Sequence, residues 1–480
     1  MREIMKAMII SRPVLLVLGC LFIGLSGCNK LLEVPKPPNE ILIADAFKDS
    51  ASATSALSGV YSGMLFNNRN FAWGGVTIYT GLSGDDLSYT STNSDLLQLN
   101  LNALNVSNLL LPQTWSEAYA LLLKVNTVIE QLNNNPPLAA SVRAKLLGEA
   151  LFVRAFIDFH LVNLWGDGAA LTTTADLGKN SMMPSTPSGV MYAQIISDLQ
   201  QAAAGMSNTY PTINRSRPNA MAARALLSRV YLYNRQYQEA LVMADSVIGS
   251  GLYTPLPPVS MTFAPTSTEI IWALQPSPNP PAYGVTGDGV AFVPSSPALP
   301  PAYNLTSQLL TAFEPGDMRK TSWTKTAVVA TVPYTYPFKY KLGLLDGVLG
   351  KGTENYILMR AAELFLVRAE ANCKLGNISQ AIADVNTIRA RAGLADLQGN
   401  LSPDACMAAI EQENRVEYFA EWGHRWFDLK RWPATDGSGN SLADQLLPSI
   451  KPSWQPFQKL YPISRNELTY DPFLKQNPGY

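Results

Sequence analysis

The sequence predicts a mainly α-helical protein in which pairs of helices form a scaffold and long irregular, loop-rich insertions interrupt it. Three observations predict this class. Apolar side chains recur at helical spacing in several segments, two helix pairs share one spacing of small residues, and two long stretches lose that periodicity. Because 47% of the 480 residues are hydrophobic, burying a large core is easy.

Residues 1–28 have the pattern of an export signal. Arg2, Lys6 and Arg12 give a positive start, and the apolar run that follows is shorter than the roughly 20 residues of a membrane span. The run ends in Leu-Ser-Gly-Cys at residues 25–28, which resembles the lipobox of bacterial lipoproteins. That resemblance implies removal of residues 1–27 and acylation of Cys28. An ordinary signal peptide with a cysteine near its end is the alternative.

The residues after Cys28 form a short proline-containing stretch. Pro35, Pro37 and Pro38 indicate that residues 28–40 are a tether between the lipid and the globular body. No later run of 18 apolar residues occurs, so no transmembrane helix is expected.

Helical periodicity dominates the rest of the chain. Helices are expected over residues 45–65, 115–132, 141–165, 190–204, 219–233 and 237–248. The last two form a pair in which the small residues Ser228 and Ala240 lie 12 positions apart, as do Ala369 and Ala381 in a second pair. This spacing matches tetratricopeptide repeats. Generic antiparallel helix pairing explains it without repeat ancestry.

Two stretches break the helical pattern. Residues 67–112 and 252–305 are rich in glycine, proline, asparagine, serine and aromatic residues, and the proline run near residue 278 excludes a helix there. Irregular insertions of this length in a helical scaffold are unusual and often functional. We therefore expect the binding surface to lie on these loops.

Composition excludes several classes of function. Lysine plus arginine is 36 and aspartate plus glutamate is 37, without a basic run, which argues against nucleic-acid binding. Two histidines make a histidine-rich metal site improbable, so no metal or other cofactor is expected. Cys373 and Cys406 lie in helical patterns, which favours two free buried thiols over a disulfide.

Ordered strings in the chain carry a family resemblance. The most specific are Gly-His-Arg-Trp-Phe-Asp-Leu-Lys-Arg-Trp at residues 423–432 and Asn-Pro-Gly-Tyr at residues 477–480. Others occur at residues 313–319, 358–364, 368–371, 375–377, 388–393, 414–417 and 461–464. The chain resembles the SusD/RagB family of surface nutrient-binding lipoproteins from the lipobox to its last residue. It departs from the family pattern at residues 168–171, at Asn414, and in the single acidic residue, Glu33, that follows Cys28 closely.

The resemblance implies a fold, a function and partners. It implies one SusD-like domain over residues 41–480, with an N-terminal part of about 41–310 and a C-terminal part of about 311–480. It also implies a lipoprotein of the outer membrane that faces the cell exterior. Such a protein would bind glycans without catalysis and deliver them to a SusC-like TonB-dependent transporter.

Aromatic residues of the irregular stretches are the candidate ligand contacts. Flat rings stack on the apolar faces of sugars, while amide and charged side chains bond their hydroxyls. The candidates in these stretches are Trp73, Tyr79, Tyr89, Tyr283, Phe292 and Tyr303, and Trp323, which follows the string at residues 313–319, joins them. The alternative is that these aromatic side chains bind no ligand and only hold their loops in place.

Other polar residues admit catalytic interpretations. Arg425 and Asp428 are three apart on a predicted helix and would pair there, with Glu417 and His424 nearby. A buried polar network is favoured over an acid–base site because no nucleophile motif or metal spacing occurs. His160 is expected in the core, and the adjacent carboxylates at residues 85 and 86 have no identified glycosidase partner. A glycoside hydrolase and a helical-repeat, peptide-binding lipoprotein remain as alternatives.

Overall fold

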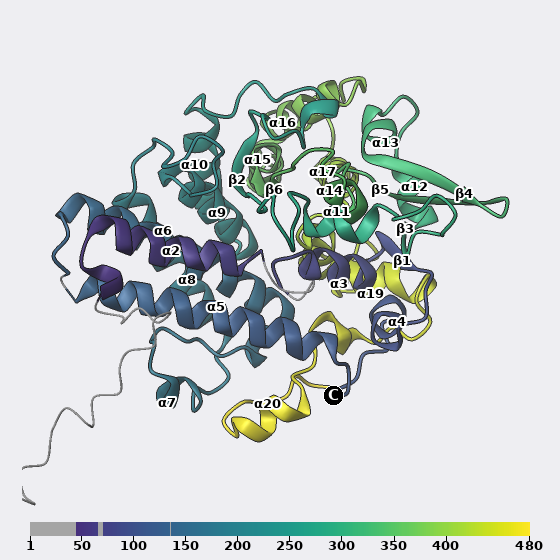
Figure 1. The fold of residues 1–480 in the computed structure, drawn as a ribbon. Coiled ribbons are helices and arrows are strands. Elements are labelled where there is room, and N and C mark those ends of the chain that lie inside the picture. The colour runs from purple at the N-terminus through teal and green to yellow at the C-terminus, as the bar shows by residue number, and fades with distance from the viewer. Residues whose placement is uncertain (1–44, 66–70, 135) are drawn as a thin grey trace, which may run out of the picture. The chain divides into compact units, whose positions relative to one another are not determined.

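A layer of long helices forms the first part of the structure. The computed structural model describes residues 45–65, 71–134 and 136–480, and its contacts separate residues 1–46 from the unit Phe47–Tyr480. The predicted signal peptide, Cys28 and the tether lie outside the described residues. In the second unit, four long helices pack side by side (Figure 1): α2 (Ser50–Gly63), α5 (Leu110–Asn133), α6 (Ala140–Trp165) and α8 (Ser188–Gly205). All four had been expected at these places.

The two predicted helix pairs are present and stack on each other. They are α9 (Ala220–Tyr233) with α10 (Tyr237–Ile248), and α15 (Ala362–Lys374) with α16 (Ile378–Arg391). Ser228 Oγ donates to the Ala240 carbonyl at 2.8 Å, so a small residue allows the first pair to pack closely. Ala369 and Ala381 are fully buried in the second pair. Helix α10 contacts α15, which joins pairs that are far apart in the sequence.

The C-terminal segments add further helices around these pairs. Helix α17 (Pro403–Tyr418) packs on the second pair, and α18 (His424–Arg431) packs on α17 and α3. Short helices complete the unit: α7 (Leu177–Asn180), α12 (Ser307–Ala312), α13 (Met318–Trp323), α14 (Leu344–Val348), α19 (Leu442–Leu446) and α20 (Arg465–Tyr470). The mainly α class is confirmed. None of the described helices is long and apolar enough to cross a membrane.

The two stretches expected to be irregular contain regular elements, which corrects the sequence interpretation. The first holds α3 (Gly75–Ser83), β1 (Leu87–Tyr89) and α4 (Ser94–Leu101), and the second holds β2 (Ile270–Leu274), α11 (Gly287–Phe292) and β3 (Tyr303–Leu305). Helix α3 escaped detection because it is buried on every side. A helix without a solvent-facing side has no amphipathic period to recognise.

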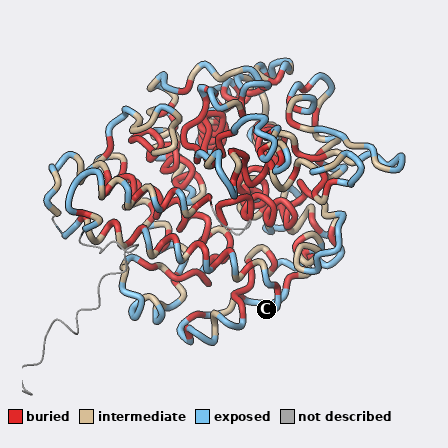
Figure 2. Tube along the Cα trace, viewed as in Figure 1, coloured by how far each residue is buried: buried red, intermediate tan, exposed pale blue. Residues whose placement is uncertain are grey.

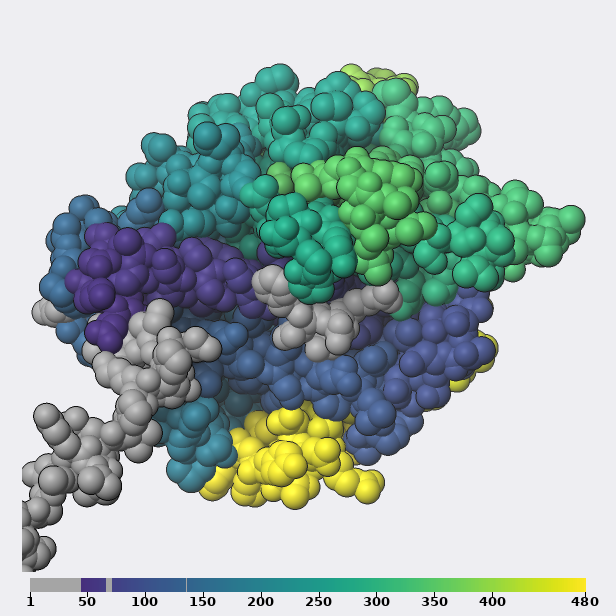
Figure 3. All heavy atoms as spheres, viewed as in Figure 1, coloured from purple at the N-terminus to yellow at the C-terminus, as the bar shows by residue number. Residues whose placement is uncertain are grey.

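Three two-stranded antiparallel sheets connect distant segments. β1 pairs with β3, β2 pairs with β6 (Tyr356–Arg360), and β4 (Thr324–Val329) forms a hairpin with β5 (Val332–Pro337). β2 and β6 are buried at every residue, and they lie among the red core segments of Figure 2. The β4–β5 hairpin projects from the surface (Figure 3).

A buried ion-pair network holds the C-terminal helices together. The Glu417 carboxylate, fully buried on α17, accepts hydrogen bonds from Arg319, Arg360 and Arg391. Arg360 also donates to Glu269 at 2.9 Å and to Glu421 at 2.8 Å. Arg319, Arg360, Arg391 and Glu417 belong to strings that carry the family resemblance, and their role in the structure is to lock the scaffold.

The expected pairing of Arg425 with Asp428 is wrong. Arg425 Nε and Nη2 donate to the two carboxylate oxygens of Asp85 at 2.7 and 2.8 Å, while Asp428 pairs with Arg431. The Arg425–Asp85 pair ties α18 to the segment after α3. A partner 340 positions away cannot be recognised from helical spacing.

Both remaining cysteines are free and buried, as expected. Burial raises the pKa of the Cys406 thiol to about 12 and also raises that of Cys373. Since the thiolate is the nucleophile, we predict that native protein at pH 8 leaves both cysteines unlabelled by iodoacetamide while urea-unfolded protein is alkylated at both. Mass spectrometry of the two peptides would measure this, and fast labelling of either cysteine in native protein would contradict it.

Candidate functional site

The second irregular stretch closes over the first to form a pocket of about 470 Å³. Its walls come from the end of β1, the start of α4, helix α11 and the segment that leads into β3. We call it the Tyr89 pocket, and the described residues that line it include no charged side chain. The lining residues are Tyr89, Asn93, Leu96, residues 290–295, residues 299–303 and Leu344.

Three of the predicted aromatic residues meet in this pocket. Tyr89 and Tyr303 are directly opposite in the β1–β3 register, and their ring centroids lie 5.5 Å apart. Phe292 stands edge-on to Tyr303 at 5.9 Å. Tyr303 and Phe292 are only 4% and 3% exposed, whereas Tyr89 is half-buried. Tyr89 therefore offers the accessible ring, and the other two rings support it.

Hydrogen bonds from Thr90, directly after β1, and from Asn304 on β3 hold the proline-rich wall of the pocket. Thr90 donates through its amide to Ala302 O at 3.0 Å and through its hydroxyl to Pro301 O at 2.8 Å. Asn304 adds a side-chain bond to Pro301 O at 3.1 Å. Prolines have no amide hydrogen, so neighbouring residues must supply the bonds that fix such a segment.

Asn93 places a polar group at the same pocket. Its Oδ1 caps α4 by accepting from the amides of Asp95 and Leu96 at 3.0 Å each. The backbone N–H of Asn93 donates a hydrogen bond to the Tyr89 hydroxyl at 3.3 Å. Asn93 is exposed, so an amide side chain and a phenol hydroxyl lie together beside the accessible ring.

Helix α11 is held in place by close approach to α3. A Cβ on Gly287 would lie 2.6 Å from the backbone carbonyl of Trp73, so only glycine fits at this position. Asp288 beside it accepts a hydrogen bond from the Tyr356 hydroxyl at 3.0 Å. The element that carries Phe292 therefore rests on the buried core.

Other predicted ligand contacts are buried, which corrects their assignment. Trp323 is 1% exposed and donates its indole N–H to Val259 O at 2.9 Å beside the ion-pair network. Tyr79, at 4% exposure, is part of the buried helix α3, and Trp73, at 8%, packs edge-on against Tyr356. These rings present no free face for stacking. Tyr283 is half-buried but does not line the Tyr89 pocket.

Sequence reasoning missed Asn93, Leu96 and Leu344 as pocket residues. Leu344 is one of four exposed apolar residues on α14 and its C-cap, with Leu345, Val348 and Leu349, and their exposed fractions are 44–61%. These apolar residues, which lie between Gly343 and Gly350, were the sequence signal that could have identified Leu344. Asn93 carried the weaker signal of a helix cap.

The polar residues considered for catalysis have structural partners. Burial opposes ionisation of Asp85, but Arg425 and Arg415 outweigh it and lower the pKa of this carboxyl. Burial, with the charge of Asp85, raises the pKa of Asp86 to about 7. Both are almost completely buried and line no part of the Tyr89 pocket. They therefore do not form an accessible pair for attack on a glycosidic bond.

Both histidines pack against aromatic or backbone neighbours, His160 fully buried and His424 half-buried. His160 Nδ1 bonds to Phe156 O at 2.8 Å, and burial lowers the pKa of His160 to about 3, as expected for a core histidine. His424 stacks on Tyr418 with ring centroids 4.4 Å apart. Burial lowers its pKa well below the usual value, with Arg229 and Arg360 adding to the effect. Among the described residues, no cluster of three or more histidine, cysteine, aspartate or glutamate side chains is arranged to hold a metal.

Comparison with family models matches both ends of the chain. Residues 331–480 match the model described as the SusD family, and residues 51–232 match one described as "Starch-binding associating with outer membrane". Among curated relatives, the SusD-like proteins P25 and P2 of Formosa agariphila are 22% and 26% identical to the chain. The alignments cover 95% and 96% of this chain and 97% and 98% of those proteins.

Solved structures share the fold. A SusD superfamily protein of Bacteroides vulgatus superposes with a TM-score of 0.77 at 20% identity, covering 90% of this chain and all of that one. A laminarin-binding SusD-like protein superposes with a TM-score of 0.75 at 23% identity, with the same coverage of both chains. The fold and the matches to the family models define the chain as a SusD-like protein. The chain belongs to the SusD/RagB family, and the description of the second model suggests association with the outer membrane.

Proposed function

We propose that the protein is a non-catalytic lipoprotein that captures glycans or oligosaccharides in the Tyr89 pocket. The observation that carries this proposal is the pocket itself, which combines an accessible ring, neighbouring amide and hydroxyl groups, and no charged lining residue among those described. Such a lining suits uncharged sugar rings, which need an apolar face to stack on and polar groups for their hydroxyls.

The names of structural relatives support the same ligand class. Besides the laminarin-binding protein, a surface glycan-binding protein A of Bacteroides uniformis shares the fold with a TM-score of 0.75 at 21% identity, covering 89% of this chain and 99% of that one. The starch-binding description of the second family model agrees.

A glycan array is the direct test of capture. Full chain purified in detergent is applied to neutral plant, algal and bacterial glycans, and positive glycans are titrated by calorimetry. We expect binding to a subset of neutral oligosaccharides and no release of reducing ends on prolonged incubation. Signals equal to buffer for every glycan would overturn the proposal, and hydrolysis would replace it with a glycosidase.

The cellular part of the proposal is delivery to a SusC-like TonB-dependent transporter. Acylated Cys28 would hold the protein in the outer membrane, facing the cell exterior, and the proline-containing residues 28–40 would let it reach the transporter. We expect affinity purification of the acylated chain from its own membranes to retain a transporter barrel. If the transporter no longer copurifies with the Cys28→Ser protein, the lipid anchor is supported. If no transporter copurifies with the wild-type protein, the partnership is contradicted.

A further inference from the structure

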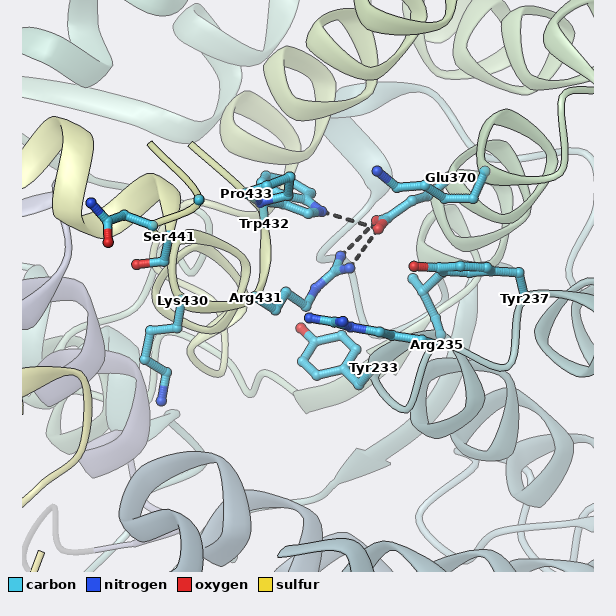
Figure 4. Close-up of a pocket in the computed structure, with 13 residues that line it drawn as sticks. Tyr233, Arg235, Tyr237, Glu370, Lys430, Arg431, Trp432, Pro433 and Ser441 are labelled. Atoms are coloured by element: carbon cyan, nitrogen blue, oxygen red, sulfur yellow. Dashed lines mark hydrogen bonds and ion pairs between the residues drawn. The ribbon is translucent and has the colours of Figure 1, made fainter. Parts of the chain in front are cut away.

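A second pocket, of about 400 Å³, lies between the two helix pairs and the end of α18. Its walls come from the turn that joins α9 to α10, from α15, and from the segment after α18 (Figure 4). We call it the Arg235 pocket. Its lining contrasts with that of the Tyr89 pocket because it includes the cationic residues Arg235, Lys374, Lys430 and Arg431 and the single carboxylate Glu370.

Arg235 occupies a position that the other helix pair gives to glycine. In each pair three residues join the helices, and the middle one is left-handed: Arg235 at φ 60° and Gly376 at φ 84°. The hydrogen bonds also correspond. Gln236 N–H donates to Tyr231 O at 2.8 Å, and Asn377 N–H donates to Asn372 O at 2.8 Å. Left-handed backbone is costly for a residue with a Cβ, so the first turn holds an arginine where a glycine would be more stable. Strain of this kind is retained where the side chain has a task.

The floor of the Arg235 pocket is already neutralised. Arg431 donates through its two terminal nitrogens to the Glu370 carboxylate at 2.5 and 2.6 Å, and through Nε to Asp428 at 2.8 Å. Its guanidinium carbon lies 4.6 Å from the ring centroid of Tyr233 and 4.9 Å from that of Trp432. Lys430 donates to Asn163 O, and its ammonium points away from this group in Figure 4.

Two exposed cations at the pocket, Arg235 and Lys374, lie outside this ion-pair group. Arg235 and Lys374 are both exposed, and within residues 45–65, 71–134 and 136–480 neither forms a salt bridge. In Figure 4 the side chains of Arg235 and Tyr237 extend from the turn toward the Arg431–Glu370 pair, and the hydroxyl end of Tyr237 faces that pair. Asn440, which is exposed, adds an amide to the lining of the pocket.

We propose that the Arg235 pocket is a second saccharide site that takes an acidic sugar unit, with its carboxylate or sulfate held by Arg235 and Lys374. Tyr237 and Asn440 then lie where the ring hydroxyls would be bonded. A cavity of 400 Å³ suits a small ligand, and its concave shape favours a sugar unit over the flat contact of a protein surface. This site and the Tyr89 pocket are lined by different residues, so each can fail a test without the other.

The test compares trigalacturonic acid with its fully methyl-esterified form, which keeps the sugar but loses the charge. Calorimetry on the full chain in detergent at 50 mM NaCl should show millimolar or tighter binding of the acid and at least tenfold weaker binding of the ester. The informative variant is Arg235→Gly, because it removes the guanidinium and at the same time restores the residue of the matching turn. Arg465→Ala, an exposed arginine on α20, is the matched control.

Arg235→Gly should weaken binding of the acid at least tenfold while its melting temperature equals or exceeds that of the wild type. Lys374→Ala should weaken binding as well, and Arg465→Ala should not. Equal affinities for acid and ester, no binding by 10 mM, or wild-type affinity of both Arg235→Gly and Lys374→Ala would each overturn the proposal. Tighter binding of a hexaglutamate peptide in competition would also overturn it, by identifying the pocket as a protein contact.

Discussion

Replacing Glu417 with alanine is expected to lower the free energy of unfolding by about 3–5 kcal/mol. The carboxylate is fully buried and accepts hydrogen bonds from three arginines, Arg319, Arg360 and Arg391. Removing one member of a buried ion network leaves the others with uncompensated charge, which costs more than the loss of an exposed pair. Urea denaturation followed by circular dichroism measures the change. Glu239→Ala, on the exposed side of α10, should stay within about 0.5 kcal/mol of the wild type.

The same residue predicts a pH dependence. Burial opposes ionisation of Glu417, but Arg391 and Arg360 outweigh it and hold its pKa well below the usual range. A carboxyl whose folded pKa is lowered contributes stability above its unfolded pKa of about 4.3, and this contribution is lost as pH falls toward the folded value. The wild type should therefore lose stability between pH 5 and pH 3 more steeply than Glu417→Ala. If the stability of the two proteins falls equally steeply with pH, the network does not stabilise the fold. The same conclusion follows if Glu417→Ala lowers the free energy of unfolding no more than Glu239→Ala does.

Replacing Tyr89 with alanine is expected to weaken glycan binding at least tenfold, or by about 1.4 kcal/mol or more. Tyr89 is the accessible ring of its pocket, whereas Phe292 and Tyr303 are almost completely buried beneath it. Loss of the ring removes the stacking surface and also the hydroxyl that Asn93 contacts. Calorimetry with the tightest neutral glycan from the array measures the affinity.

Two further variants separate the possible reasons for a weakened affinity. Tyr89→Phe keeps the ring and should retain most of the binding. Tyr470→Ala removes a tyrosine that is 78% exposed on α20, outside this pocket, and should bind as the wild type does. An unchanged affinity of folded Tyr89→Ala would remove this residue from the site and leave half-buried Tyr283 as the remaining aromatic candidate.

Local patterns predicted the scaffold well. The long helices and both helix pairs came from apolar spacing, and the small residues Ser228, Ala240, Ala369 and Ala381 lie buried in those pairs. Helix α3 and strand β2 were missed because each is buried on every side, so their sequences lack the alternation of apolar and polar residues that marks an exposed element.

The candidate site was predicted only in part. The aromatic candidates included Tyr89, Phe292 and Tyr303, which share a pocket, but also Trp323, which lies in the core. Residue type does not separate these cases because an aromatic side chain serves equally in a core and at a binding surface. The cation pair at Arg235 and Lys374 gave no signal in the sequence, since the two residues lie on different helix pairs.

The helical class and the pairing of neighbouring helices could be predicted from sequence alone because they depend on residues within a few turns of one another, and the family resemblance because it depends on short strings that occur in order. The folded structure was needed to show that Tyr89 contacts Tyr303, that Asp85 pairs with Arg425, and that Glu417 accepts hydrogen bonds from three arginines. Each of these contacts joins segments separated along the chain, and charge or ring type alone does not specify the partner. Burial of the intervening elements brings the partners together, and burial is a property of the folded chain as a whole.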